Sequence, residues 1–249
     1  MSQRLKLIVA YDGSQFAGWQ SQSHRNTIQD HLERAFQRVG GKDLRIHGAG
    51  RTDSGVHAVA QCAHVDLADN NLSASRWTSA LNSILPPTIR VLRCRYVSKH
   101  FHARFSAKGK IYRYRIWSAP VLPPLEFGRA WHVATPLDFE VLKAEANYFV
   151  GTHDFAGFAA SRAKPSKNTI RTINSVRVRC SGPRVTIEFD GDGFLYKMVR
   201  LIVGSLVHCA LGKLPIEEIT DRLASGSGRT GHARFVAPAE GLFLVRVRY

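Results

Sequence analysis

The order of hydrophobic periods along the chain constrains the fold more than any other feature of the sequence. Residues 4–11 alternate like a strand, and the helical pattern that follows begins at Thr27 and ends at Gly40-Gly41. The other expected elements of this half are strands near 43–48 and 58–67, a Ser73-capped helix to Leu85 and a strand over 89–97. The order β-α-β-β-α-β predicts a ferredoxin-like module.

The second half of the chain shows a similar order without visible sequence identity to the first. Its expected elements are a strand over 110–117, a helix over 138–150, a hairpin of 170–180 and 184–190, a long helix over 194–211, a short helix opened by Pro215 and a strand over 241–249. We therefore predict an α+β fold of two ferredoxin-like halves, residues 1–107 and 108–249. We expect them to form one broad, mainly antiparallel sheet with helices on one face and a central substrate cleft.

Charge points to a polyanionic partner. The 249 residues include 35 Lys and Arg against 19 Asp and Glu, a net charge of +16, so attraction to phosphate favours nucleic acid. No apolar run approaches the roughly 20 residues that span a bilayer, and the N-terminus lacks a signal-peptide core. We expect a cytoplasmic protein without a membrane partner.

Cysteine and histidine spacing does not indicate a metal site. The four cysteines are far apart and form no Cys-x-x-Cys pair; they are Cys62, Cys94, Cys180 and Cys209. His100 and His102 form the closest histidine pair, but no further ligands accompany them at suitable spacing. We expect buried thiols and no catalytic metal.

A glycine-rich segment is the strongest candidate for chemistry. It reads Gly48-Ala-Gly-Arg51-Thr52-Asp53-Ser54-Gly55-Val56-His57-Ala58. Asp53 stands where a dinucleotide fingerprint needs its third glycine, and Val56-His57 stands where a phosphate loop needs Lys and then Ser or Thr. Ser54 lacks the preceding glycine of a nucleophile elbow. Two readings stay open: a tight turn in which Asp53 only bonds backbone amides, or a loop that exposes a reactive carboxylate.

These eleven residues closely resemble the active-site stretch of the tRNA pseudouridine synthase A family, and the resemblance runs nearly end to end. The other matching segments are Tyr11-Asp12-Gly13 with Phe16, Gly18, Trp19 and Gln20; 101–107 leading to 112–114; 151–155; 193–200; and 237–244. The sequence departs from the family pattern at Trp117-Ser118 and over 121–127. The resemblance implies the same two-part architecture and isomerisation of uridine to pseudouridine without a cofactor.

The resemblance also implies roles for particular residues. Asp53 matches the catalytic aspartate, Arg51 the residue that pushes toward the position vacated by the flipped uridine, and Tyr112 the tyrosine that stacks on the base. Arg200 matches the arginine that pairs with the aspartate, which must stay ionised in a partly dry cleft. Each has a plainer alternative: Arg51 as one phosphate contact among many, Arg200 reaching solvent, and Tyr112 as core.

Substrate contacts are expected from further residues. Leu242 is expected to line the pocket, and His57 either faces the same cleft or is an ordinary strand residue. The densest basic group, expected to contact the RNA backbone, is Arg162, Lys164, Lys167 and Arg171. Family members act as homodimers on uridines 38 to 40 of the tRNA anticodon stem-loop. The main competing hypothesis is a non-catalytic RNA-binding protein, although the usual aromatic RNA-binding motif is missing.

Overall fold

The computed structural model describes residues 3–23, 26–40, 43–68, 72–160, 168–225 and 231–249. The chain divides into two compact units, each with its own set of internal contacts. Unit 1 comprises Met1–Lys108 and Phe243–Tyr249, and unit 2 comprises Gly109–Leu242. The last strand, which the sequence pattern assigned to the second half, thus lies almost wholly in unit 1.

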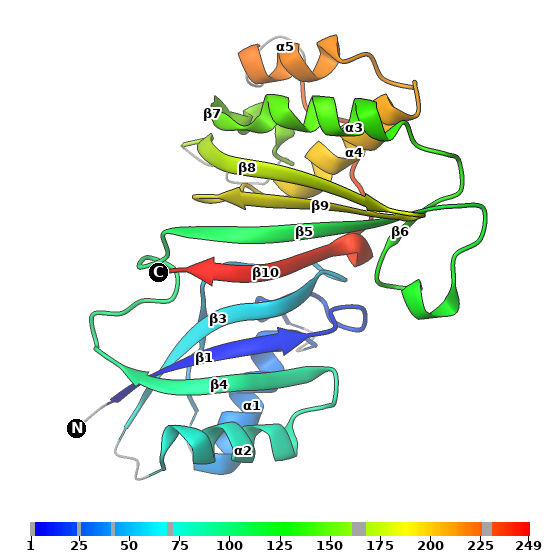
Figure 1. Cartoon of the computed structure of the whole chain (residues 1–249). Helices are drawn as coiled ribbons and strands as arrows, with labels where there is room; N and C mark the ends of the chain where they lie inside the picture. The colour runs from blue at the N-terminus through cyan, green and yellow to red at the C-terminus, as the bar shows by residue number, and fades with distance from the viewer. Residues whose placement is uncertain (1–2, 24–25, 41–42, 69–71, 161–167, 226–230) are drawn as a thin grey trace. The chain divides into compact units, whose positions relative to one another are not determined.

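Unit 1 is a sheet with two helices on one face (Figure 1). Its elements are β1 (Gln3–Tyr11), α1 (Ile28–Gly40), β2 (His47–Gly48), β3 (His57–Leu67), α2 (Ala74–Ile84), β4 (Ile89–Val97) and β10 (Leu242–Arg248). The strand order is β4-β1-β3, and both β2 and β10 pair with β3. All pairs are antiparallel except β3 with β10. The predicted β-α-β-β-α-β order is confirmed.

The two helices of unit 1 begin where their caps predict. Thr27 Oγ1 accepts a hydrogen bond from the backbone N of Asp30 at 3.3 Å, and Asp30 Oδ2 accepts one from the Thr27 backbone N at 3.2 Å. Ser73 Oγ accepts from the backbone N of Arg76 at 3.3 Å. Such caps satisfy amide groups that the first helical turn leaves unpaired. The rings of Phe36 and Trp77 pack at 5.0 Å between centroids, which joins the two helices.

Unit 2 is also built on an antiparallel sheet. Its elements are β5 (Gly109–Ser118), β6 (Trp131–Val133), α3 (Phe139–Ala146), β7 (Gly151–Asp154), β8 (Ile170–Ser181), β9 (Arg184–Gly191), α4 (Met198–Ala210) and α5 (Glu217–Ser225), with short 3-10 turns between them. The order is β5-β9-β8-β7, and β6 pairs in parallel with β5. The chain is therefore α+β, as predicted, with antiparallel pairing dominant in each unit.

Three element predictions were wrong in detail. The strand expected over 43–48 is reduced to the two residues of β2, and β6 and β7 were not expected. The long helix of unit 2 begins at Met198 instead of residue 194, because Lys197 has a positive φ of 58° that an α-helix does not contain. The helix expected over 138–150 ends at Ala146 and continues as a 3-10 turn.

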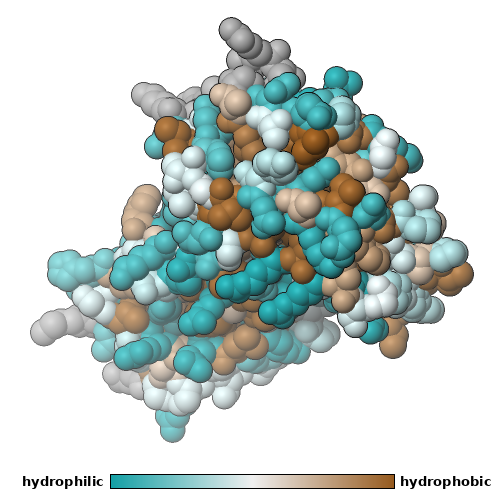
Figure 2. All heavy atoms as spheres, turned by 45° about the horizontal axis from the view of Figure 1, so that its top comes forward, coloured by the Kyte–Doolittle hydropathy of each residue, from teal (hydrophilic) through white to brown (hydrophobic). Residues whose placement is uncertain are grey.

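Apolar side chains fill the interior of each unit and also reach the surface in places. Leu5, Leu7 and Val9 of β1 are fully buried. Leu125 and Phe127, in the segment between β5 and β6, are 84% and 77% exposed. Hydrophilic and hydrophobic side chains mix in small groups over the face drawn in Figure 2. Among the described residues, no helix has the length and apolar character needed to cross a membrane.

Three histidine rings gather in unit 1. The centroid of His64 lies 5.1 Å from that of His47 and 4.6 Å from that of His102. The backbone N of Ala103 donates to His64 Nδ1 at 3.1 Å. Burial lowers the pKa of His64 from 6.5 to about 4, and the positive charge of Arg4 and of the two other histidines lowers it as well. His64 is therefore neutral in the folded protein near neutral pH.

We predict that acid destabilises the protein through His64. The unfolded chain protonates this ring below pH 6.5, whereas the folded chain does so only near pH 4. The contribution of His64 is thus fully present above pH 6.5 and is lost as the pH falls, by about 2 kcal/mol between pH 8 and pH 5. Urea unfolding at both pH values, with His64→Gln for comparison, measures it. An equal pH dependence in both proteins contradicts the prediction.

Candidate active site

The loop that carries Asp53 joins β2 to β3 and is fixed by the segment 11–19. The hydroxyls of Tyr11 and Thr52 lie 2.9 Å apart, and the backbone N of Trp19 donates to the Thr52 carbonyl at 3.0 Å. Tyr11 is buried, and burial raises its pKa, so the hydroxyl stays protonated. Thr52, next to Asp53, is therefore held through both its side chain and its backbone.

Two glycines allow this close approach. A Cβ on Gly18, whose φ is +88°, would lie 2.5 Å from the Thr52 carbonyl oxygen. A Cβ on Gly13 would lie 2.0 Å from the carbonyl oxygen of Val56. Both distances are shorter than any real Cβ contact, so only glycine lets the segment 11–19 lie directly against the loop.

The loop itself turns at Asp53. The backbone N of Val56 donates to the Asp53 carbonyl at 3.2 Å, and Gly55 has a positive φ of 78°. The Ser54 hydroxyl donates to the carbonyl of Phe16 at 3.2 Å, which adds another bond to the segment 11–19. The side chain of Asp53 is half-buried at this turn. A carboxylate thus stands on a backbone whose position is fixed on both sides.

His57 supports the same region from the start of β3. Its Nδ1 accepts a hydrogen bond from the backbone N of Gly13 at 3.0 Å and lies 3.3 Å from Asp12 Oδ1. Its ring is 2% exposed and stacks on Phe243 at 4.6 Å between centroids. His57 is therefore a buried residue that supports Asp12 and Gly13, which lie against the loop.

Arg51 lies two residues before Asp53 and is exposed. Its Nε donates to Gln20 Oε1 at 3.1 Å. This bond orients the guanidinium of a residue that stays exposed. A planar cation in this setting can stack on a base and bind phosphate.

The site residues of unit 2 come from β5, from the first turn of α4 and from the start of β10. Tyr112 is buried, with its ring edge-on to Phe194 at 5.1 Å. Arg200, on the first turn of α4, is half-buried, and its Nε donates to the Ala237 carbonyl at 2.7 Å. The backbone N of Ala237 in turn donates to the Arg200 carbonyl at 3.0 Å. Leu242 is 6% exposed, in accord with an apolar pocket residue or a core residue.

Tyr114 is the core tyrosine of this unit, as predicted. It is fully buried, and its hydroxyl donates to the Pro238 carbonyl at 2.7 Å. Burial raises its pKa well above the usual value, and the positive charge of Arg200 acts in the opposite direction. Tyr114 and Arg200 are thus close enough to interact electrostatically within unit 2.

The remaining predicted residues stand as follows. Arg171 is half-buried, and its Nη1 donates to the carbonyls of Asn168 and Ile170. Arg162, Lys164 and Lys167 lie outside the described residues. Asp53 and Arg200 belong to different units, and their pairing stays a prediction. In the part of the chain that the structure describes, no three His, Cys, Asp or Glu side chains are placed to hold a metal ion.

Sequence reasoning assigned no role to the residues that fix the loop. Tyr11, Gly13, Gly18 and Gln20 all lie in the first segment that resembles the family, so the signal was present in the motif. Their function depends on a contact between segments about forty residues apart, which spacing alone does not reveal.

The site is a fixed loop that presents one carboxylate beside one exposed guanidinium, and comparison with known proteins defines its class. The sequence profile described as tRNA pseudouridine synthase matches residues 7–106 and 146–249. The chain belongs to the tRNA pseudouridine synthase family.

Individual relatives cover nearly the whole chain. It is 46% identical to "tRNA pseudouridine synthase A" of Akkermansia muciniphila, over 99% of this chain and 95% of that protein. It is 42% identical to the protein of the same name in Acetivibrio thermocellus, over 98% of this chain and 99% of that protein. The protein of that name in Solidesulfovibrio magneticus is also 42% identical, over 99% of this chain and 91% of that protein. The predicted family is confirmed.

We predict that Gly13→Ala destabilises the protein by roughly 1–3 kcal/mol, because the new methyl group would overlap the Val56 backbone. Gly40→Ala, at the end of α1, is the matched control, since among the described residues its Cβ would meet Trp77 at 3.5 Å, an ordinary contact. Urea unfolding measures both variants. Equal stability of the two would show that the segment 11–19 does not need its close contact with the loop.

Proposed function

We propose that the protein converts uridine to pseudouridine in the anticodon stem-loop of tRNA, at positions 38 to 40, without a cofactor. The observation that carries this proposal is the loop around Asp53, whose neighbours on both sides are hydrogen-bonded to the segment 11–19. Family membership supports the reaction class, and the net charge of +16 supports an RNA substrate.

The reaction needs no redox partner. The bond between ribose C1′ and base N1 breaks, the base rotates, and C1′ bonds to base C5. The proton on C5 is then lost and N1 gains one, so atoms and electrons balance. The work of the protein is to expose the uridine, hold the freed base and stabilise the charges that develop.

Asp53 acts in this proposal as nucleophile or as base on the sugar. A carboxylate can attack and leave again, which divides one difficult step into two easier ones. Arg51 occupies the space that the flipped uridine leaves, because its exposed guanidinium can stack and bind phosphate at once. Tyr112 and Leu242 contact the base, and Arg200 supplies the cation that keeps Asp53 ionised.

RNA binding involves a wider set of basic residues. We propose backbone contacts from Arg162, Lys164, Lys167 and Arg171, and a cytoplasmic homodimer as the active form. His57 supports substrate binding indirectly, through its hydrogen bond with Gly13.

We predict that Asp53→Asn abolishes catalysis while RNA binding persists, because the amide can neither attack nor take a proton. The measurement is tritium release from unmodified tRNA labelled at uridine C5, with and without a chelator, alongside tRNA binding. Asp43→Asn makes the same change at an exposed acid of unit 1 and should leave release intact. Turnover by Asp53→Asn would remove Asp53 from its role, and inactivity of the wild type would favour a binding protein.

We also predict that Arg200→Gln lowers kcat/KM for tRNA, since Asp53 would lose its cation, and that Arg200→Lys, which keeps the charge, retains more of the activity. Arg179→Gln, at an exposed position on β8, removes the same charge from unit 2 and serves as the control. Equal losses in Arg200→Gln and Arg200→Lys would assign Arg200 a purely structural role through its bonds with Ala237.

A further inference from the structure

We propose that unit 1 carries a separate surface for the phosphate backbone of the tRNA, outside the catalytic loop. We name it the β1–β4 basic face and define it as Lys6 of β1 with Arg93 and Arg95 of β4. The inference rests on the proposed function, since it identifies where the body of the same substrate binds.

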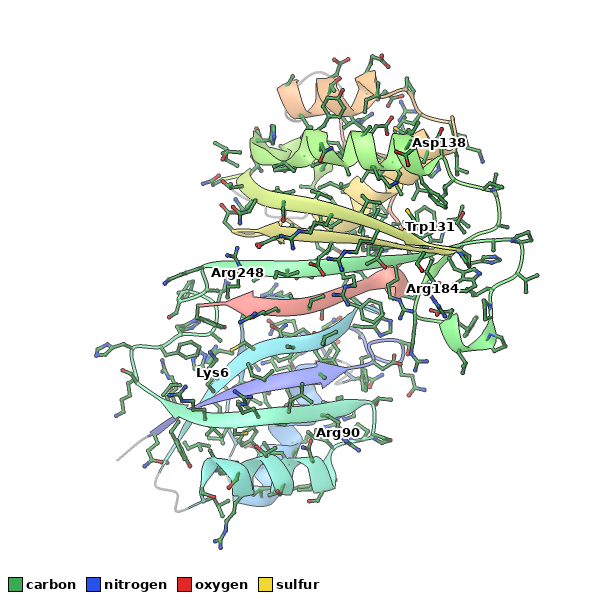
Figure 3. All side chains as sticks on the ribbon, viewed as in Figure 1. Lys6, Arg90, Trp131, Asp138, Arg184 and Arg248 are labelled. Atoms are coloured by element: carbon green, nitrogen blue, oxygen red, sulfur yellow. The ribbon has the colours of Figure 1, made fainter. Side chains whose placement is uncertain are left out.

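Strand register places the three side chains on one face of the sheet. Lys6 pairs with Arg95, and Ile8 pairs with Arg93. Residues directly opposite in an antiparallel pair project to the same side, as do residues two apart along one strand. The alternate residue Leu7 is fully buried on the side that the helices cover, so the β1–β4 basic face projects from the other side. Figure 3 labels Lys6 on β1.

The charges of this face are available to a ligand. Arg93 and Arg95 are exposed, and within the described part of the chain neither has a hydrogen-bond or ion-pair partner. Lys6 Nζ lies over two rings, 4.0 Å from the centroid of Tyr249 and 4.7 Å from that of Phe101. These rings hold the ammonium in place without neutralising it.

Two other arginines on the same strands have a structural role instead. The Nη1 of Arg90 donates to the carbonyls of Leu85, Pro86 and Ile89. Arg4 donates to both carboxylate oxygens of Asp66 at 2.7 Å. The basic side chains of β1 and β4 that have a structural role are therefore held by hydrogen bonds or an ion pair within the protein.

The arrangement is costly for the protein alone. Lys6 and Arg95 are like charges in directly opposed positions, which destabilises a sheet. The sequences of β1 and β4 contain no acidic residue, and Asp66, the acid on β3, is engaged by Arg4. A polyanion bound across the strands would relieve this repulsion, and RNA is the polyanion that the proposed function supplies.

Position along the strands separates this face from the catalytic loop. Lys6 precedes Tyr11, the residue that contacts the loop, by five positions on the same strand. At about 3.4 Å per residue the two lie roughly 17 Å apart. Arg93, which pairs with Ile8, lies three positions or roughly 10 Å from Tyr11, so the β1–β4 basic face begins outside the catalytic loop and extends away from it along the strands. Phosphates on either side of the reacting nucleoside are the groups that this face would contact.

The experiment compares two double variants that remove the same charge. Arg93→Ala/Arg95→Ala alters the basic face, whereas Arg38→Ala/Arg76→Ala removes two exposed arginines from α1 and α2 on the other side of the sheet. We measure the Kd for unmodified tRNA across a range of salt, and kcat/KM for a short hairpin that carries only the target uridine and its stem.

We expect the Arg93/Arg95 variant to bind tRNA at least tenfold more weakly, with the slope of log affinity against log salt reduced by about two. Its activity on the hairpin and the tRNA affinity of the Arg38/Arg76 variant should match the wild type. Equal weakening of tRNA binding in both variants, or none in either, would overturn the inference. So would aggregation of the Arg93/Arg95 variant with unchanged tRNA affinity, because edge-strand charges can serve only to prevent strand pairing.

Failure of the proposed function would give a different set of results in the same experiment. If the wild type turned over neither tRNA nor hairpin but the Arg93/Arg95 variant still lost tRNA affinity, the β1–β4 basic face would stand and the catalytic proposal would fall. Normal turnover of the hairpin by all variants with unaltered tRNA affinity would leave the catalytic proposal standing and remove the basic face.

Discussion

The catalytic role proposed for unit 1 depends on the contact between the segment 11–19 and the loop around Asp53. The paired hydroxyls of Tyr11 and Thr52 and the backbone bond from Trp19 to Thr52 fix the loop just before the carboxylate. The bond from Ser54 to Phe16 fixes it just after. A catalytic group must be held to within a fraction of an ångström, and rigid elements do this better than free loops. Here a loop gains that rigidity from the end of β1.

How much could be predicted from the sequence depended on whether the signal was local. The helices α1 and α2 were found because Thr27 and Ser73 are cap residues before apolar runs of helical period, and the structure places both caps as expected. β6 and β7 were missed because strands of three and four residues are too short to show alternation. The start of α4 was misplaced because the left-handed backbone of Lys197 is not a typical feature of lysine.

The same distinction between local and non-local sequence signals applies to the candidate site. Asp53 and Arg51 could be singled out because glycine, acid and arginine stand together in one short stretch, and the family resemblance assigned them roles. The supports of the loop could not, because Tyr11 and Thr52 are brought together only by the pairing of β1 with β3. The basic face was hidden for the same reason: Lys6 and Arg95 are far apart in sequence and become neighbours only through strand register.

Strand β1 therefore contributes to both features of unit 1, the fixed loop around Asp53 and the β1–β4 basic face. The C-terminal end of β1, at Tyr11, positions the loop, while Lys6 in its first half lies among unneutralised charges on the open face. Hydrogen bonds and buried glycine contacts need sub-ångström fit, whereas phosphate attraction acts over roughly 10 Å and tolerates looser geometry. Placing the first at the strand end and the second in the middle of an exposed face lets one sheet provide precise placement for chemistry and broad attraction for a large polyanion.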